Sequence, residues 1–170
     1  STLTLYALSS DNFQRPPAEV SALLRLFAEY LERERRPLAE RGVRLQVIGR
    51  RDRLPAPLVA AIDRAEATTA GGDALTLRLA IDYSARDQIR SAVAAGSTDA
   101  IERWPDVDLL VRTGGEQRLS DFLLWECAYA ELLFVPKMWP EFTAEDLADA
   151  LEDFRGRNRR FGLAPEQVAS

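Results

Sequence analysis

Short apolar runs alternate along this chain with longer segments whose apolar residues recur at helical spacing. The expected strands are 3–8, 43–48, 75–83 and 107–111, and the expected helices are 16–41, 57–69, 85–94, one that begins at Asp121 and a last one capped by Thr143 and Asp146. Strands that alternate with helices form βαβ units, because a helix is the usual connection between parallel neighbours. We therefore expect an α/β fold with an open, mainly parallel β-sheet and helices on both faces.

Length and composition fit one globular unit. The 170 residues are 46% hydrophobic and 29% charged, which suits a full hydrophobic core, so we expect a single domain over residues 1–170. The longest apolar runs are too short to cross a bilayer. The lone cysteine, Cys127, excludes an intrachain disulfide, fits a reducing cytoplasm and is expected to serve packing.

Charge and histidine content exclude two classes of function. A net charge of −5 argues against broad nucleic-acid binding. Without histidine, a hydrolytic triad that contains this residue is excluded. Arginine makes up all but one of the 22 basic residues, an excess that a GC-rich genome also produces. We therefore assign a function only to arginines at strand ends beside glycine or serine.

The most informative loop is Arg-Thr-Gly-Gly-Glu-Gln-Arg-Leu-Ser, residues 112–120, at the carboxyl end of the last expected strand. Open α/β sheets bind their ligands at that end. The adjacent glycines allow a sharp turn, and Arg112 and Arg118 offer planar forks that match phosphate oxygens. Ser120 and the free N–H groups of a following helix would add anion donors. The loop predicts a receptor of diphosphate size, although glycine turns with surface arginines also occur without a ligand.

A second polar segment, Ser-Ser-Asp-Asn-Phe-Gln-Arg-Pro at residues 9–16, follows the first expected strand and precedes a helix start. Two strand ends that carry polar groups and arginine suggest one shared crevice. For Arg15 the structural alternative is a helix-entry ion pair with Glu19, four residues later. Glu116, between glycine and arginine, is expected to fix its loop by pairing with an arginine.

Both segments resemble signatures of the cis-prenyltransferase family, the undecaprenyl diphosphate synthases and their relatives. In that family they read Ser-Ser-Glu-Asn-Trp-x-Arg-Pro and Arg-Thr-Gly-Gly-Glu-x-Arg-x-Ser. The likeness continues through residues 122–132, 139–142 and 159–162, so it covers nearly the whole chain. It implies an Mg²⁺-dependent homodimeric enzyme that condenses isopentenyl diphosphate onto an allylic diphosphate such as farnesyl diphosphate, with cis geometry. The product would be a polyprenyl diphosphate precursor of a lipid carrier, and membrane contact would be at most peripheral, through that product.

The resemblance also assigns roles to individual residues. Isopentenyl diphosphate would be held by Arg112, Arg118, Leu119 and Ser120. Arg15 would contact the allylic or bridging phosphate region, and Ser9, Ser10, Asp11 and Phe13 would line the same crevice. Asp11 stands where the family has glutamate, and Phe13 where it has tryptophan.

Three further assignments concern the chemistry and the assembly. Asn12 matches a residue described as proton acceptor, but an amide is a poor base, so we expect it to orient or relay. Glu131 matches a magnesium carboxylate of the family, with an ordinary helix or turn glutamate as the alternative. Arg160 and Gly162 match a tail that reaches across a dimer to the partner's diphosphate, and a basic helix end is the plain alternative.

Two departures from the family leave a second function open. Family members carry, ahead of the position that Ser1 occupies, a strand and an Asp-Gly-Asn-Gly-Arg-Trp loop whose aspartate is essential for magnesium and catalysis. We expect that segment to belong to a longer natural chain. The connection 96–105 is also shorter than usual. The alternative to an enzyme is a non-catalytic partner subunit of the same fold.

Overall fold

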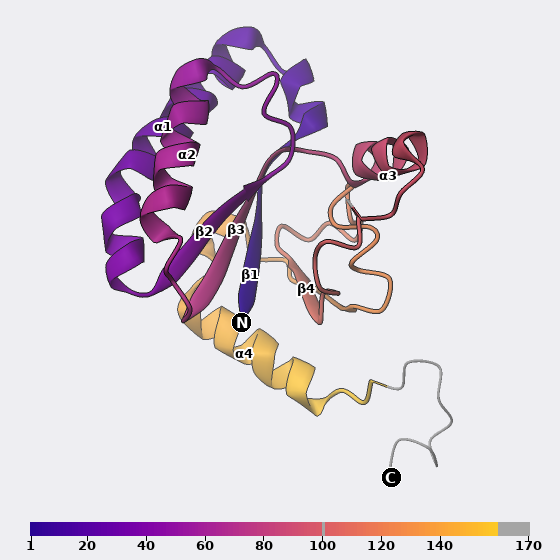
Figure 1. Ribbon diagram of the computed structural model, residues 1–170. Helices are drawn as coiled ribbons and strands as arrows, with labels where there is room; N and C mark the ends of the chain where they lie inside the picture. Colours follow the sequence, from indigo (N-terminus) through magenta and orange to yellow (C-terminus); the bar gives the residue numbers. More distant parts are fainter. Residues whose placement is uncertain (100, 160–170) are drawn as a thin grey trace. The chain divides into compact units, whose positions relative to one another are not determined.

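The computed structural model describes residues 1–99 and 101–159. The chain divides into two compact units, residues 1–84 and 85–170, and each has its own parallel strands (Figure 1). Among the described residues, no helix has the length and the apolar character that crossing a membrane requires.

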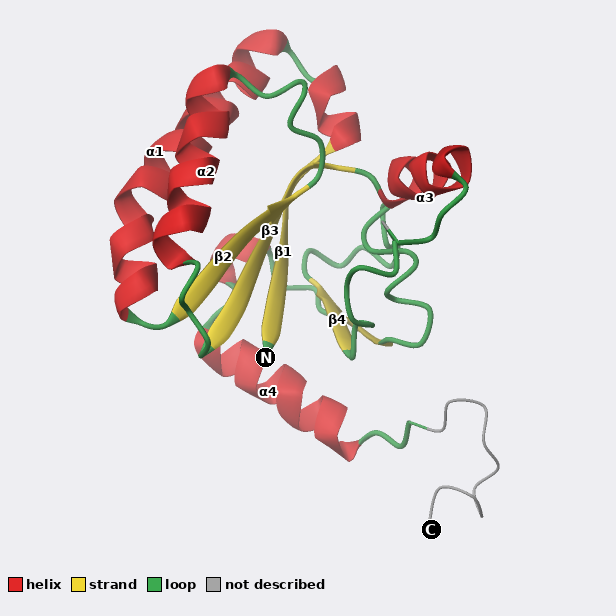
Figure 2. Cartoon of the chain, viewed as in Figure 1, coloured by secondary structure: helices red, strands yellow, loops and turns green. Residues whose placement is uncertain are grey.

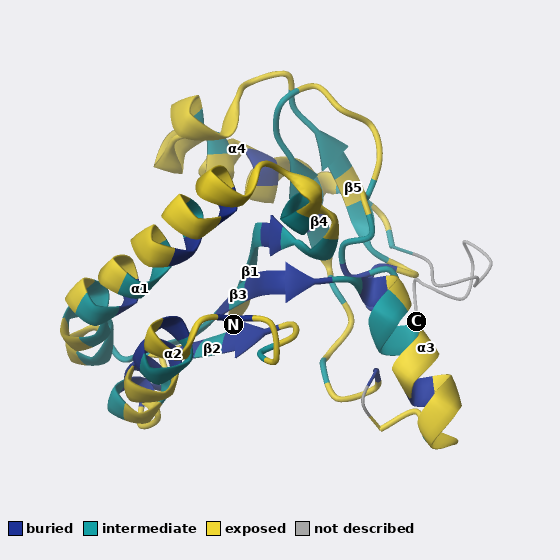
Figure 3. Ribbon diagram, turned by 90° about the horizontal axis from the view of Figure 1, so that it is seen from above, coloured by how far each residue is buried: buried dark blue, intermediate teal, exposed yellow. Residues whose placement is uncertain are grey.

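The first unit is a three-stranded parallel sheet with two helices. Its elements are β1 (Thr2–Ser9), α1 (Pro17–Glu40), β2 (Val43–Ile48), α2 (Ala56–Thr69) and β3 (Leu75–Tyr83), with a short 3₁₀ helix, η1 (Ser10–Gln14), after β1. The strand order is β1-β3-β2, and β1 and β2 both pair in parallel with the central strand β3. The helices α1 and α2 lie side by side on one face (Figures 1 and 3). These strands and both long helices were predicted to within one residue at each end.

The core of this unit lies between that face of the sheet and the two helices. The helical spacing in α2 places its apolar residues on one buried face, formed by Leu58, Ala61, Ile62 and Ala65. The apolar residues that recur along α1 are buried at Val20, Leu24 and Leu31 and partly buried at Leu23, Phe27 and Leu38. The outer side of α1 faces solvent (Figure 3). Complete burial of one such Leu or Ile side chain contributes about 1.5–3 kcal/mol to folding.

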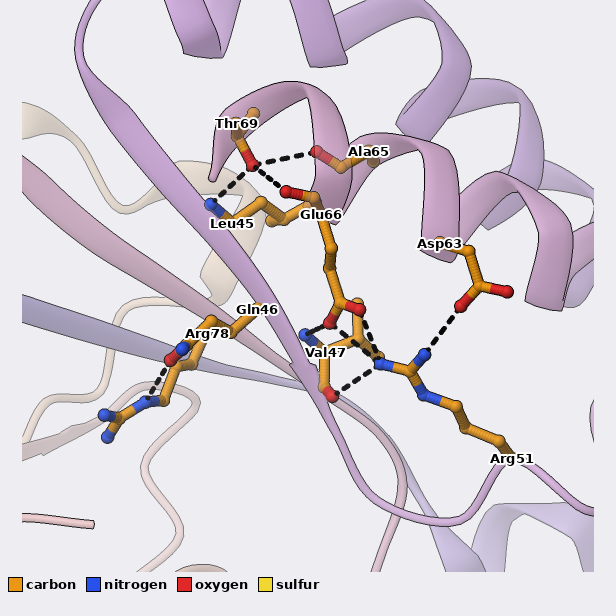
Figure 4. Close-up of polar contacts among 9 residues, drawn as sticks. All are labelled: Leu45, Gln46, Val47, Arg51, Asp63, Ala65, Glu66, Thr69 and Arg78. Atoms are coloured by element: carbon orange, nitrogen blue, oxygen red, sulfur yellow. Dashed lines mark hydrogen bonds and ion pairs between the residues drawn. The ribbon is translucent and has the colours of Figure 1, made fainter. Parts of the chain in front are cut away.

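Side chains of α2 accept hydrogen bonds from the backbone N–H groups on the outer edge of β2 (Figure 4). The N–H of Leu45 donates to Thr69 Oγ1 at 3.0 Å, and the N–H of Val47 donates to Glu66 Oε1 at 2.8 Å. Glu66 in turn accepts from Arg51, whose Nη2 lies 2.8 Å from Oε1 and 2.9 Å from Oε2. Because an unpaired strand edge would leave its N–H groups unsatisfied, these contacts close the edge of the sheet and fix α2 against it.

In its described part, the second unit contains two parallel strands and two longer helices. Its elements are α3 (Ala85–Ala95), β4 (Leu109–Arg112), β5 (Glu131–Phe134), a 3₁₀ helix, η2 (Trp139–Glu141), and α4 (Ala144–Gly156). The predictions of α3, β4 and α4 are confirmed, whereas β5 was not predicted. β4 begins two residues later than expected, since the N–H of Val107 donates to the carbonyl of Glu126 at 2.8 Å.

The prediction of a helix that begins at Asp121 is wrong. Residues 120–129 form turns and bends (Figure 2), and Ser120, Asp121 and Leu123 have positive φ angles of 51°, 64° and 46°. Left-handed residues interrupt the backbone ladder that a right-handed helix needs. Asp121 instead caps α3, because its carbonyl accepts from the N–H of Ala85 at 3.1 Å and its Oδ1 from the N–H of Arg86 at 2.9 Å. In this turn segment Cys127 is buried, as expected for packing, and burial raises the pKa of its thiol to about 11.

Candidate functional site

The loop 112–120 makes the sharp turn predicted from its two glycines. Gly114 and Gly115 have φ angles of 89° and 75°, in the left-handed region that glycine adopts without steric cost. Their N–H groups donate to the carbonyls of Lys137 at 2.8 Å and Val135 at 2.9 Å. The loop is therefore held along the segment that follows β5, at the carboxyl end of the strand pair.

Arg112 joins the two ends of this loop. Its Nη1 donates to Ser120 Oγ at 2.8 Å and also to the backbone carbonyl of Arg118. Arg118 pairs with Glu116, the loop-fixing role expected for that glutamate. The structure thus brings Arg112, Arg118 and Ser120 together, with Leu119 half-buried between the last two. No helix begins after Ser120, so the expected helical N–H donors are not part of this loop.

The polar segment after β1 is organised as a capping box. The N–H of Asn12 donates to Ser9 Oγ at 3.2 Å, and the N–H of Ser9 donates to Asn12 Oδ1 at 3.0 Å. Because Oδ1 accepts from the backbone, the side-chain amide presents its NH₂ donors beyond the turn. This arrangement favours an orienting role for Asn12, as expected for an amide. The helix-entry pair is also present, with Arg15 Nη1 at 3.0 Å from Glu19 Oε1.

Sequence reasoning missed two residues that contact this segment, Arg53 and Asp82. Asp82, at the end of β3, is completely buried and accepts from Ser10 Oγ at 2.8 Å and from Arg53 Nε at 2.8 Å. The hydrogen bond to Asp82 raises the pKa of the Arg53 guanidinium above its ordinary value. A lone acidic residue at the end of an apolar strand was a usable signal for Asp82. Arg53 was hidden by the arginine excess and lies beside neither glycine nor serine.

Glu131 lies away from the arginine loop of its own chain. It is the first residue of β5 and pairs in register with Leu109, whereas Arg112 pairs with Phe134. At a rise of about 3.3 Å per residue, roughly 10 Å of strand separates the two positions. The Oε2 of Glu131 accepts from Arg157 Nη1 at 3.1 Å.

The described residues do not form a metal site made of protein side chains alone. In residues 1–99 and 101–159, no group of three Asp, Glu, His or Cys side chains could hold a metal ion. Mg²⁺ is usually bound by one or two carboxylates together with substrate phosphates and water. The expected carboxylate, Glu131, is here neutralised by an arginine, and magnesium ligation by Glu131 stays a prediction.

Two other expectations also stay predictions. Arg160 and Gly162 lie outside the described residues. The segment 9–16 belongs to the first unit and the loop 112–120 to the second, so their shared crevice remains an inference from the sequence.

Comparison with known proteins identifies relatives across almost the whole chain. The family model described as "Putative undecaprenyl diphosphate synthase" matches residues 1–162. Isoprenyl transferase 1 of Bradyrhizobium diazoefficiens is 55% identical over 186 residues, which cover 99% of this chain and 76% of that protein. This alignment is longer than the 170 residues of the chain, so the relative carries residues between matched segments that this chain lacks. A Xanthomonas axonopodis pv. citri protein, named ditrans,polycis-undecaprenyl-diphosphate synthase ((2E,6E)-farnesyl-diphosphate specific), is 44% identical and covers 99% of this chain and 74% of its own.

Solved structures agree with the sequence relatives. A probable undecaprenyl diphosphate synthase from Campylobacter jejuni superposes with a TM-score of 0.86 at 34% identity, over 95% of this chain and 83% of that one. Lavandulyl diphosphate synthase from Lavandula x intermedia, in complex with dimethylallyl diphosphate, gives a TM-score of 0.83 at 34% identity, over 95% and 78%. The expected α/β fold with a parallel open sheet is confirmed, and the chain belongs to the undecaprenyl diphosphate synthase family of cis-prenyltransferases.

Proposed function

We propose that this protein condenses isopentenyl diphosphate onto an allylic diphosphate, with farnesyl diphosphate as the primer, and forms a cis-polyprenyl diphosphate. The observation that carries the proposal is the loop 112–120, in which Arg112 links Arg118 and Ser120 at a strand end. The relatives named above are transferases and synthases, which supports an enzyme over a non-catalytic partner subunit.

In the proposed reaction the chain mainly positions two anions. The allylic C–O bond breaks, diphosphate leaves with the electron pair, the double bond of isopentenyl diphosphate attacks the allylic carbon, and a proton is lost to leave a cis double bond. A guanidinium has five N–H donors, so Arg112 can keep its contact with Ser120 and still donate to diphosphate oxygens. Arg118 would neutralise the same group, with Leu119 beside it, since charge stabilisation and orientation supply most of the rate enhancement.

The segment after β1 would serve the allylic side. Asn12, whose Oδ1 is engaged by the N–H of Ser9, would orient a substrate group with its NH₂ donors. Ser9, Ser10, Asp11, Phe13 and Arg15 would line the same region. The departing proton would then pass to a diphosphate oxygen, since an amide is a poor base.

The cofactor, the assembly and the location are part of the same proposal. Magnesium is proposed from the family, where it neutralises diphosphate charge. A homodimer is supported by exposed apolar side chains of the second unit, including Val93, Trp125 and Tyr129. The free thiol of Cys127 supports a reducing compartment, and we propose the cytoplasm.

The test is a condensation assay. The full natural chain is incubated with labelled isopentenyl diphosphate, farnesyl diphosphate and MgCl₂, and the products are separated by chain length. Labelled polyprenyl diphosphates are expected, with no incorporation when the allylic primer is omitted. Absence of incorporation with farnesyl, geranyl and dimethylallyl diphosphates alike would contradict the proposal.

A further inference from the structure

Three loops of the first unit meet at the carboxyl end of its parallel sheet. They are η1 after β1, residues 49–55 after β2, and the end of β3. Side chains from the first two, Ser10 and Arg53, converge on the carboxylate of Asp82, which lies at the end of the central strand β3.

Asp82 is a buried charge with a full set of partners. It is 0% exposed, and its φ of 52° lies in the left-handed region. Arg53 binds it through two nitrogens, Nε to Oδ2 at 2.8 Å and Nη2 to Oδ1, while Ser10 Oγ donates to Oδ1 at 2.8 Å. A buried carboxylate is costly unless it is paired and hydrogen-bonded, so its geometry is closely constrained.

Arg53 also contacts η1 directly. Its guanidinium lies over the ring of Phe13, 4.5 Å from the ring centroid, which is the geometry of a cation–π contact. The Arg53–Asp82 pair, called the clamp below, therefore contacts η1 at two points, Ser10 and Phe13. Asn12 lies between these two points and is fixed by its own bonds to Ser9.

The base of the clamp is fixed by close backbone packing. The N–H of Arg50 donates to the carbonyl of Asp82 at 3.0 Å. Gly49 has a φ of 116°, and a Cβ at this position would lie 2.1 Å from the carbonyl oxygen of Ile81. Only glycine lets the loop approach the end of β3 this closely. The backbone of the loop that carries Arg53 is therefore held against the end of β3.

We propose that Arg53 and Asp82 are positioning residues that hold η1, and with it Asn12, in the orientation needed for the allylic substrate. This inference rests on the proposed function, because it assigns these two residues to the same reaction. They act through η1, and their effect is expected on turnover more than on the binding of isopentenyl diphosphate, which is assigned to the loop 112–120.

The chain offers a matched control. Arg51 lies in the same loop and also binds a carboxylate. Its Nη2 contacts both carboxylate oxygens of Glu66, so this contact is made to α2 and not to η1 (Figure 4). Arg53→Lys removes the planar fork while keeping the charge, Asp82→Asn removes the charge while keeping the volume, and Arg51→Lys repeats the first change away from η1.

The first measurement is hydrogen exchange in the full-length protein without substrate. The amides of Ser9, Asn12 and Arg15 report on η1, and those of Leu45 and Val47 report on the rest of the unit. In Arg53→Lys and Asp82→Asn, the η1 amides are expected to exchange roughly tenfold faster while the two reference amides stay unchanged. Arg51→Lys is expected to leave the η1 amides at the wild-type rate.

The second measurement is steady-state kinetics. Both clamp variants are expected to lower kcat by up to roughly 100-fold with an unchanged KM for isopentenyl diphosphate, since small misplacements of a reacting group are that costly. The double variant should be no slower than the slower single variant, because both changes remove one interaction.

Two results would overturn the clamp: wild-type exchange of η1 in both variants, or equal acceleration of the Leu45 and Val47 amides, which indicates general destabilisation. A wild-type protein without condensation activity would contradict the proposed function, while the exchange contrast between Arg53→Lys and Arg51→Lys would still decide on the clamp.

Discussion

At the scale of single residues, Arg112 and Arg118 share the proposed binding of diphosphate, but Arg112 has a second task. It also holds Ser120 in place. Arg118→Ala should remove one charge-assisted contact worth about 1.5–3 kcal/mol, which raises the KM for isopentenyl diphosphate by about tenfold or more. Arg112→Ala should raise it further, because Ser120 is released as well.

These KM values are measured with the allylic substrate saturating. Arg64→Ala is a suitable control, since this exposed arginine of α2 pairs with Glu32 of α1. Unchanged KM and turnover in both the Arg112 and the Arg118 variant would remove the two arginines from the site.

Glu131 can be tested for its two roles separately. If it binds magnesium, Glu131→Gln should move the magnesium optimum to higher concentration, because one carboxylate charge is lost from the site. Arg157→Gln keeps that carboxylate but removes its ion pair, and serves as the comparison. A magnesium titration of Glu131→Gln that superimposes on wild type, together with lower stability in both variants, would make Glu131 a structural partner of Arg157.

At the scale of elements, the start of α4 carries the capping box that the sequence predicted. Thr143 Oγ1 accepts from the N–H of Asp146 at 3.3 Å, and Asp146 Oδ2 accepts from the N–H of Thr143 at 2.6 Å. Thr143→Ala should lower the free energy of unfolding by about 1 kcal/mol, whereas Thr143→Ser should keep most of it. Urea denaturation of both variants gives the comparison, and equal loss in the serine variant would contradict the capping role.

Acid should weaken the same helix start. The Lys137 ammonium and the bonds from Thr143 lower the pKa of Asp146 from 3.8 to about 2. A lowered pKa means that the carboxylate stabilises the folded state above about pH 4, and that this contribution is lost as the pH falls toward 2. Asp146→Asn should show a smaller loss of stability across this window than wild type in circular dichroism titrations.

Elements were predictable where local pattern and tertiary packing agree. The alternation in 75–83 and the helical spacing from Val20 to Leu38 both describe faces that are buried in the first unit. Residues 120–130 have a helix-like composition, yet Asp121 caps another helix and its backbone is left-handed. No local sequence pattern encodes the capping role of Asp121, because the helix that it caps, α3, is distant in the sequence.

The candidate site also has features that the sequence predicts and features that depend on the fold. The turn at Gly114 and Gly115 and the pairing of Glu116 followed from residue chemistry. Asp82 and Arg53 lie far apart in the sequence, and only the order of the strands brings their loops together. Sequence spacing could therefore identify the loops that carry polar groups, but not the pair that joins two of them.

At the scale of the whole molecule, the proposed homodimer gives a complementation test for Arg160. A chain with Arg160→Ala is mixed with a chain with Arg112→Ala, and the subunits are exchanged. If the tail acts in the neighbouring site, one site of the mixed dimer collects both defects and the other is restored. Activity should then exceed that of either parent, and a lack of recovery or a monomer in light scattering would argue against a shared site.

The strand order β1-β3-β2 also sets a sequence of events during synthesis on the ribosome. Of the three described strands of the first unit, β1 precedes the others in the chain, but its described partner is β3, with Thr2 beside Thr76 and Ser9 beside Tyr83. Until β3 emerges, the N–H and C=O groups of β1 remain without that ladder, and closing so long a loop slows folding. The nascent chain therefore exposes the apolar strand β1 until β3 has been made, which makes β1 a candidate site for chaperone binding.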